Sequence, residues 1–189
     1  INLHRLSAFS DGLSGGNPAG VVIETSMPSV AAMQSLAAKL GYSETVFAMP
    51  HIVIPHTPLN TAWRARYFSP ETEVPFCGHA TIALGAALAK AYGNGEYALT
   101  LNDAQISIYA ELDGELTTAA LQSPPTRSEP LSAQCLSEIL HLFNYKTADL
   151  DPRIPSALAS AGASHAIIAL HSREALSRMQ YDLSLGRAL

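Results

Sequence analysis

The chain carries the run Pro75-Phe76-Cys77-Gly78-His79-Ala80-Thr81, which opens an alanine-rich stretch over residues 82–92. A glycine and small polar residues at the start of a helix leave backbone N–H groups unpaired at the positive end of the helix dipole. Such a helix start favours a bound carboxylate or phosphate. The same field favours a thiolate at Cys77, so the run predicts a site that holds an anionic substrate, supplies an acid or a base, or does both.

Residues 78–92 are mostly Ala, Gly, Ile and Leu on every side, which predicts a helix enclosed by other elements. A second helix, with one buried face, is predicted over residues 30–40, and Gly41 is its stop. A loop is expected over residues 50–60. Strand patterns occupy residues 3–9, 19–23, 45–49, 62–69, 97–101, 105–112 and 116–122. This order favours an α+β fold over a regular βαβ repeat.

A proline-rich segment divides the chain. Residues 123–130 hold Pro124, Pro125 and Pro130, which predicts a linker over residues 124–130 between a first domain, 1–123, and a second domain, 131–189. In the second domain we expect a helix over residues 132–143, an irregular segment over 149–161, a strand over 164–170 and a short helix over 172–179. About 60 residues is the low edge for an independently stable fold, so this domain is expected to be incomplete.

The composition excludes several classes of partner. A net charge of −5 with scattered Lys and Arg argues against binding to nucleic acid. No apolar run reaches the ~18 residues of a membrane span, and residues 1–9 show no signal-peptide pattern, so we expect a cytoplasmic protein. The two cysteines form no disulfide framework, and the seven histidines show no four-ligand spacing, so we expect no metal site.

Three segments resemble the PhzF-like family of phenazine-biosynthesis proteins. They are Gly-Asn-Pro-Ala-Gly-Val-Val at 16–22, Gly-Tyr-Ser-Glu-Thr-Val-Phe at 41–47, and Phe-Ser-Pro-Glu-Thr-Glu-Val-Pro-Phe-Cys-Gly-His-Ala-Thr at 68–81. Each segment alone is a weak match, whereas the three in this order are specific. The resemblance implies a diaminopimelate-epimerase-like fold, in which two similar domains each wrap a curved, mostly antiparallel sheet around a central helix. The active site of that fold lies in the cleft between the two domains.

The resemblance also implies an activity, namely isomerisation of a small carboxylate-bearing metabolite by proton transfer, without metal or organic cofactor. In the family, the acidic residue of the Ser-Glu-Thr segment, here Glu44, is the general acid/base. His79 lies beside it to hydrogen-bond the substrate, and the dipole is expected to keep its imidazole neutral. Gly78 and Cys77 shape the site of the substrate's carboxylate. A homodimer is the expected assembly.

Two further residues are weaker candidates for substrate binding. The resemblance puts Glu73 near the substrate pocket, and Asn17 belongs to a loop that could shape the site. A solvated acidic residue before a helix and a plain turn explain the two residues nearly as well.

Two alternatives remain open. Racemases and epimerases of this fold use a pair of cysteines, and Cys77 would need Cys135 as its partner, although Cys135 falls in an amphipathic helix where a buried thiol is more common. The other alternative is a shortened, non-catalytic half that binds small anions or a partner chain. Family members continue past this length and carry an acidic segment ending in a Thr-Gly-Ser-Ala-like turn, and no such segment follows Pro124 here.

Overall fold

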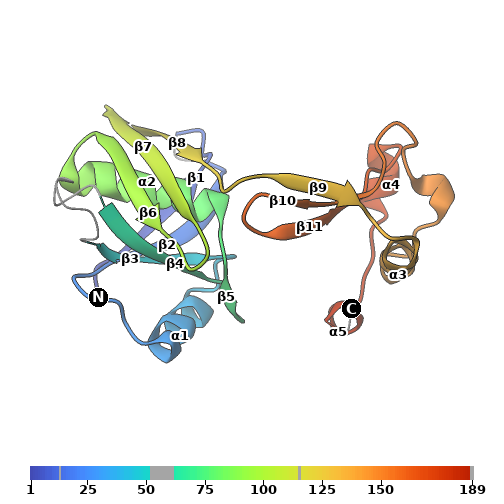
Figure 1. Cartoon of the computed structure of the whole chain (residues 1–189), viewed down its shortest axis with the longest axis horizontal. Helices are drawn as coiled ribbons and strands as arrows, with labels where there is room; N and C mark the ends of the chain where they lie inside the picture. Colours follow the sequence, from blue (N-terminus) through green and yellow to red (C-terminus); the bar gives the residue numbers. More distant parts are fainter. Residues whose placement is uncertain (13, 52–61, 115, 188–189) are drawn as a thin grey trace. The chain divides into compact units, whose positions relative to one another are not determined.

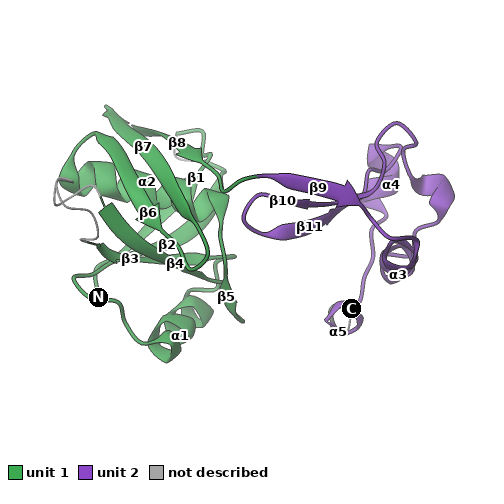
Figure 2. Cartoon of the chain, in the orientation of Figure 1, with its two compact units in different colours: residues 1–125 green, residues 126–189 purple. Residues whose placement is uncertain are grey.

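The structure is a computed structural model that describes residues 1–12, 14–51, 62–114 and 116–187 (Figure 1). The chain forms two compact units, Ile1–Pro125 and Thr126–Leu189 (Figure 2). Of the loop expected over residues 50–60, the part from 52 onward lies outside the described residues. No helix among the described residues is both long enough and apolar enough to span a membrane.

Unit 1 is built on one eight-stranded sheet. The strands run in the order β1-β2-β3-β4-β6-β7-β8, and the short β5 pairs with β4. Neighbouring strands are antiparallel, except that β2 pairs with β3 and β4 pairs with β6 in parallel. The strands are β1 (Leu3–Ala8), β2 (Asn17–Ile23), β3 (Thr45–Pro50), β4 (Ala62–Phe68), β5 (Glu73–Val74), β6 (Gly95–Thr100), β7 (Gln105–Asp113) and β8 (Leu116–Gln122).

Helix α2 (Gly78–Tyr92) fills the concave side of this sheet (Figure 1). It contacts β1 and β2 near one end of the sheet and β7 and β8 at the other, so the sheet curls around it. Its buried residues are Ala80, Thr81, Ala83, Leu84, Gly85, Ala87, Leu88 and Ala89. A Cβ at Gly85 would lie 2.5 Å from Cδ1 of Ile108, so the glycine permits the close approach of β7. The predicted α+β fold with an enclosed central helix is confirmed.

Side chains alternate between the two faces of the sheet, as a pleated strand requires. In β3, Val46 and Ala48 pack on the α2 side, whereas Phe47 points to the opposite side. There Phe47 meets Phe68 edge-on and joins Met33 of α1 (Val30–Leu40) in a second, smaller core. The sheet therefore buries both faces in its centre.

Helix α1 (Val30–Leu40) covers this second face. The Ser29 hydroxyl accepts a hydrogen bond from the Ala32 N–H at the start of the helix, and Gly41 ends it in the left-handed conformation with φ 68°. The chain then turns through three residues into β3. Helix α1 and its stop residue were both predicted correctly from the sequence.

Unit 2 has a three-stranded sheet in the order β11-β10-β9 and short helices. The predicted linker is wrong over Arg127–Pro130, because these residues form strand β9 and pair with β10. Pro130 is compatible with a strand because β9 lies at the edge of the sheet. The elements are β9, α3 (Ala133–Leu142), a 3-10 turn (Thr147–Asp149), β10 (Ala157–Ser160), β11 (Ser164–Ile167), α4 (Arg173–Ser177) and α5 (Leu183–Gly186).

Strand β10 also corrects the irregular segment expected over residues 149–161. Unit 2 buries few side chains. Among its described residues, Leu140, Asp151 and Ala175 are buried. Strands β9 and β11 are exposed along their whole length.

Candidate functional site

The end of α1 and the start of β3 position Glu44. Gly41 reverses the chain after α1, and the backbone of Glu44 is tied to β2 through a hydrogen bond from the Gly20 N–H to its carbonyl, 3.4 Å. A Cβ at Gly20 would lie 2.8 Å from the Thr45 hydroxyl, so this close approach requires glycine. The Glu44 side chain remains 23% exposed. The backbone of Glu44 is therefore held in place, and its carboxylate is accessible to solvent.

Cys77 is the residue that precedes α2, in an extended conformation with φ −145° and ψ 116°. Its carbonyl accepts two hydrogen bonds from Thr81, one from the backbone N–H at 3.0 Å and one from the hydroxyl at 2.7 Å. Because the Thr81 hydroxyl donates its only proton there, the buried Tyr67 hydroxyl donates to Thr81, 2.8 Å away. This buried chain of hydrogen bonds holds the start of α2 in place.

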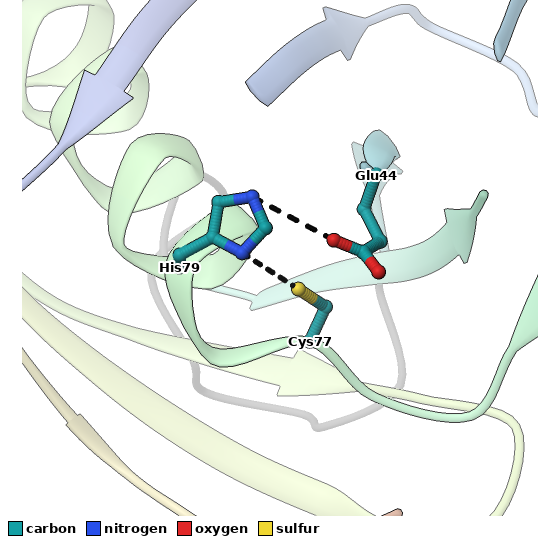
Figure 3. A group of neighbouring side chains, drawn as sticks. All are labelled: Glu44, Cys77 and His79. Atoms are coloured by element: carbon teal, nitrogen blue, oxygen red, sulfur yellow. Dashed lines mark hydrogen bonds and ion pairs between the residues drawn. The ribbon is translucent and has the colours of Figure 1, made fainter. Parts of the chain in front are cut away.

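Glu44, Cys77 and His79 meet at the start of α2 (Figure 3). His79 Nδ1 lies 3.1 Å from the Cys77 Sγ, and His79 Nε2 lies 3.7 Å from a Glu44 carboxylate oxygen. The Ser43 hydroxyl is 3.4 Å from the same Nε2. The two ring nitrogens thus face different partners, and the His79 side chain is only 10% exposed.

The environment of Cys77 corrects one expectation. Burial raises the pKa of the Cys77 thiol to about 12, and the Glu44 carboxylate acts in the same direction. Backbone N–H groups of Ala80 and His79 act in the opposite direction and are outweighed. A helix N-terminus favours an anion by only about 0.3–1 kcal/mol, which is less than one pKa unit. The predicted thiolate is therefore wrong, and Cys77 is a thiol at neutral pH.

The single proton of the Cys77 thiol has two neighbouring acceptors, His79 Nδ1 and the Glu44 carboxylate. In one arrangement of a neutral imidazole, the thiol donates to Nδ1. In that arrangement the ring N–H sits on Nε2 and points towards Ser43 and Glu44. In chemical terms, the cluster presents a carboxylate that can take up a proton beside an N–H that can donate a hydrogen bond.

Gly78 is the first residue of α2, and its backbone is open. Apart from its chain neighbours and the backbone of its own helix, no atom of the described residues lies within 4 Å of the position that a Cβ would take, so packing does not require a glycine here. A small anion could approach this helix start closely.

The two weaker candidates lie elsewhere in unit 1. The Glu73 carboxylate accepts two hydrogen bonds from Arg66, at 2.8 and 2.6 Å, and one from Asn102 at 2.7 Å. Hydrogen bonding by Arg66 holds the pKa of Glu73 below its ordinary value. Asn17 is exposed and begins β2, opposite Ala8. The described contacts give Glu73 a structural role, and contact of either residue with substrate stays a prediction.

Sequence reasoning missed three residues that support the site, namely Ser43, Tyr67 and Thr81. Thr81 follows Cys77 by one helical turn, the spacing at which a Thr hydroxyl bonds a preceding carbonyl, so this contact had a readable signal. Ser43 is adjacent to Glu44 in sequence and is itself part of the Ser-Glu-Thr segment. Tyr67 had no such signal, because it lies on β4 and meets Thr81 of α2 only in the folded structure.

The sequence matches the family described as "Phenazine biosynthesis-like protein" over residues 6–188. The isomerase YddE of Escherichia coli O157:H7, itself called uncharacterized, is 30% identical over 191 residues, which cover 99% of this chain and 62% of YddE. An uncharacterized isomerase of Clostridium acetobutylicum is 27% identical, covering 96% of this chain and 60% of that protein. The chain thus spans less than two thirds of the length of these relatives.

Solved structures show the same fold. PA4716 of Pseudomonas aeruginosa, described as a predicted epimerase, superposes with a TM-score of 0.85 at 25% identity over 99% of this chain and 65% of that one. A PhzF-family phenazine biosynthesis protein of Bacillus anthracis superposes with a TM-score of 0.76 at 23% identity over 100% of this chain and 62% of that one. With the sequence match over residues 6–188, these similarities show that the chain belongs to the phenazine biosynthesis-like (PhzC-PhzF) protein family.

Proposed function

We propose that this chain is an isomerase that moves a proton on a small carboxylate-bearing metabolite by general acid/base catalysis, without an organic cofactor or a catalytic metal. The observation that most supports this proposal is that the Glu44 carboxylate and the His79 ring lie together at the open start of α2. The relatives named isomerases agree with this activity. We further propose a cytoplasmic homodimer.

The geometry suggests a role for each group. The backbone at Gly78, with Cys77 beside it, would receive the substrate carboxylate at the positive end of α2. Glu44 would take a proton from one carbon of the substrate and become a carboxylic acid, and it would then return the proton to another position of the same molecule. The His79 Nε2–H would donate a hydrogen bond to the electron-rich intermediate. No atom is gained or lost overall.

The thiol-based alternative is less well supported. Proton abstraction by sulfur needs a thiolate, and the pKa of Cys77 is raised to about 12. Its possible partner, Cys135, belongs to α3 of unit 2. We therefore assign the proton to Glu44 rather than to Cys77.

The test is exchange of substrate hydrogen with solvent deuterium. Amino-, hydroxy- and ring-unsaturated carboxylic acids would be incubated with the parent chain in D2O and followed by proton NMR. Glu44→Gln should slow the exchange about 10²–10⁴-fold, the usual contribution of a general acid/base. Glu96→Gln is the matched control, because this residue is exposed on β6 and is not a member of the cluster. Equal exchange by the parent and Glu44→Gln would remove Glu44 from the mechanism.

A further inference from the structure

The cluster at the start of α2 brings together three different metal-ligand atoms. One ligand atom each from Glu44, Cys77 and His79 lies within 4.8 Å of the other two. Among the residues that the structure describes, these three form the only group of this kind. The spacing in the sequence does not predict it, because Glu44 precedes β3 whereas Cys77 and His79 flank the start of α2.

The donor set suits one class of cation. A thiolate sulfur, an imidazole nitrogen and a carboxylate oxygen are the ligands of Zn²⁺, which is usually four-coordinate. Three protein ligands leave a fourth position for water. Harder cations such as Mg²⁺ and Ca²⁺ prefer sites made of oxygen ligands.

We propose that Glu44, Cys77 and His79 bind Zn²⁺, and that the bound ion inhibits the protein by occupying the Glu44 carboxylate. The binding follows from the three ligands alone. The inhibition rests on the proposed function, because it requires Glu44 to be the group that carries the proton.

The distances support such a site. In a tetrahedral Zn²⁺ site with Zn–S of about 2.3 Å and Zn–N of about 2.0 Å, the sulfur and nitrogen lie about 3.5 Å apart. Here the Cys77 Sγ is 3.1 Å from His79 Nδ1, and the Glu44 oxygen is 3.7 Å from His79 Nε2. These two contacts involve different ring nitrogens, and with one atom from each residue the three ligand atoms lie within 4.8 Å of one another, so side chains must rotate to bring them around one ion.

The charges also balance. Binding replaces the thiol S–H bond by an S–Zn bond and releases the proton to solvent. The thiolate and the Glu44 carboxylate then carry two negative charges against the two positive charges of the ion. The α2 N-terminus opposes a cation with only about half a positive charge, which is smaller than the charge of the two ligands.

The test is a Zn²⁺ titration of the chelator-treated chain in competition with a chromophoric chelator, in buffer without added thiol. The parent should bind one ion at the cluster. Cys77→Ser should weaken that binding about 100-fold or more, and His79→Asn and Glu44→Gln about tenfold or more. Cys135→Ser is the matched control and should bind as the parent does, because it changes the other free cysteine. Circular dichroism checks that each variant is folded.

Cobalt gives a second readout. With Co²⁺ in place of Zn²⁺, a thiolate-to-metal charge-transfer band should appear in the parent and in Cys135→Ser and should vanish in Cys77→Ser. Equal Zn²⁺ affinity of the parent and Cys77→Ser, or absence of the band in the parent, would overturn the site. These measurements involve no substrate, so they are independent of the exchange test of Glu44. If Zn²⁺ binds but leaves exchange unaffected, the inhibitory role is wrong.

Discussion

The two units differ in how they bury their side chains. In unit 1 the sheet curls around α2, and large residues such as Trp63, Tyr67 and Leu88 are almost fully buried. In unit 2 the outer strands β9 and β11 are exposed, and α3 buries only Leu140. Dense packing fixes the positions of side chains. The greater burial in unit 1 therefore indicates that unit 1 can hold a geometry precise enough for catalysis. All three clustered residues belong to unit 1.

The largest expected effect comes from removing a buried leucine of unit 1. Leu88→Ala leaves a cavity between α2 and the sheet and should lower the free energy of unfolding by about 2–5 kcal/mol. Leu176→Ala in unit 2 changes a side chain that is 55% exposed and should cost no more than about 0.5 kcal/mol. Urea unfolding followed by circular dichroism measures both. Similar losses would contradict the contrast between the units.

A second effect concerns two buried threonines of unit 1. Thr81→Val removes the hydroxyl that accepts from Tyr67 and donates to Cys77, and should cost about 1–3 kcal/mol. Thr45→Val is the matched control, because the Thr45 hydroxyl is buried and has no hydrogen-bond partner among the described residues. Thr45→Val should leave stability unchanged or raise it. Urea unfolding distinguishes the two, and a more stable Thr81→Val would refute the role of the Thr81 hydroxyl.

A third and smaller effect concerns the thiol of Cys77. In a Cys135→Ser background, its alkylation rate should rise about tenfold per pH unit from pH 7 to 10, because the pKa of Cys77 is raised to about 12. Glu44→Gln removes a neighbouring charge that raises this pKa, and should accelerate alkylation by less than about tenfold. A rate that levels off below pH 9 would contradict the raised pKa.

The same pKa has a consequence for stability. The ordinary pKa of a cysteine thiol is 9.0, and that of Cys77 in the folded chain is about 12. Between these two values the folded chain keeps a proton that the unfolded chain has lost. Cys77 therefore makes the folded state less stable as the pH rises through this range, and its contribution is unchanged below it.

The smallest expected effect lies in unit 2. Hydrogen bonds from Arg153 lower the pKa of Asp151 to about 2, so the contribution of Asp151 to stability is present above its ordinary pKa of 3.8 and is lost as the pH falls through about 2. Arg153→Gln should raise the pKa of Asp151 towards 3.8, as measured by carbon-13 NMR titration of the carboxyl group. The backbone N–H of residue 153 still donates to Asp151 in this variant. A complete return of the Asp151 pKa to 3.8 would therefore mean that this backbone hydrogen bond does not lower the pKa.

Local patterns predicted most elements of unit 1. The composition of α2, the Gly41 stop and the Asp113-Gly114 turn, which lies within the pairing of Asp113 with Leu116, were all readable from neighbouring residues. The parallel pairings of β2 with β3 and of β4 with β6 join residues far apart in sequence, and no local pattern specifies them. The curled sheet was therefore predicted only through the family resemblance.

The site was predicted in parts. Cys77 and His79 follow from one short run, but Glu44 was joined to them only by the resemblance, because its approach to His79 depends on how β3 meets α2. The protonation state of Cys77 was predicted wrongly. The helix dipole is a local property, whereas burial and the charge of Glu44 are tertiary and outweigh it. The wrong prediction of a linker over Arg127–Pro130 has a similar origin. In the sequence alone, a proline indicates a break in secondary structure, whereas an edge strand such as β9 tolerates it.

The fluorescence of Trp63 can distinguish the unfolding of one unit from that of the other. It is the single tryptophan of the chain, and it lies in the core of unit 1, with its ring centroid 5.0 Å from that of Tyr92. Its fluorescence therefore reports on unit 1 alone, whereas far-ultraviolet ellipticity sums over both units. If unit 2 unfolds first, the ellipticity will begin to change at denaturant concentrations where the tryptophan emission is still that of the folded core.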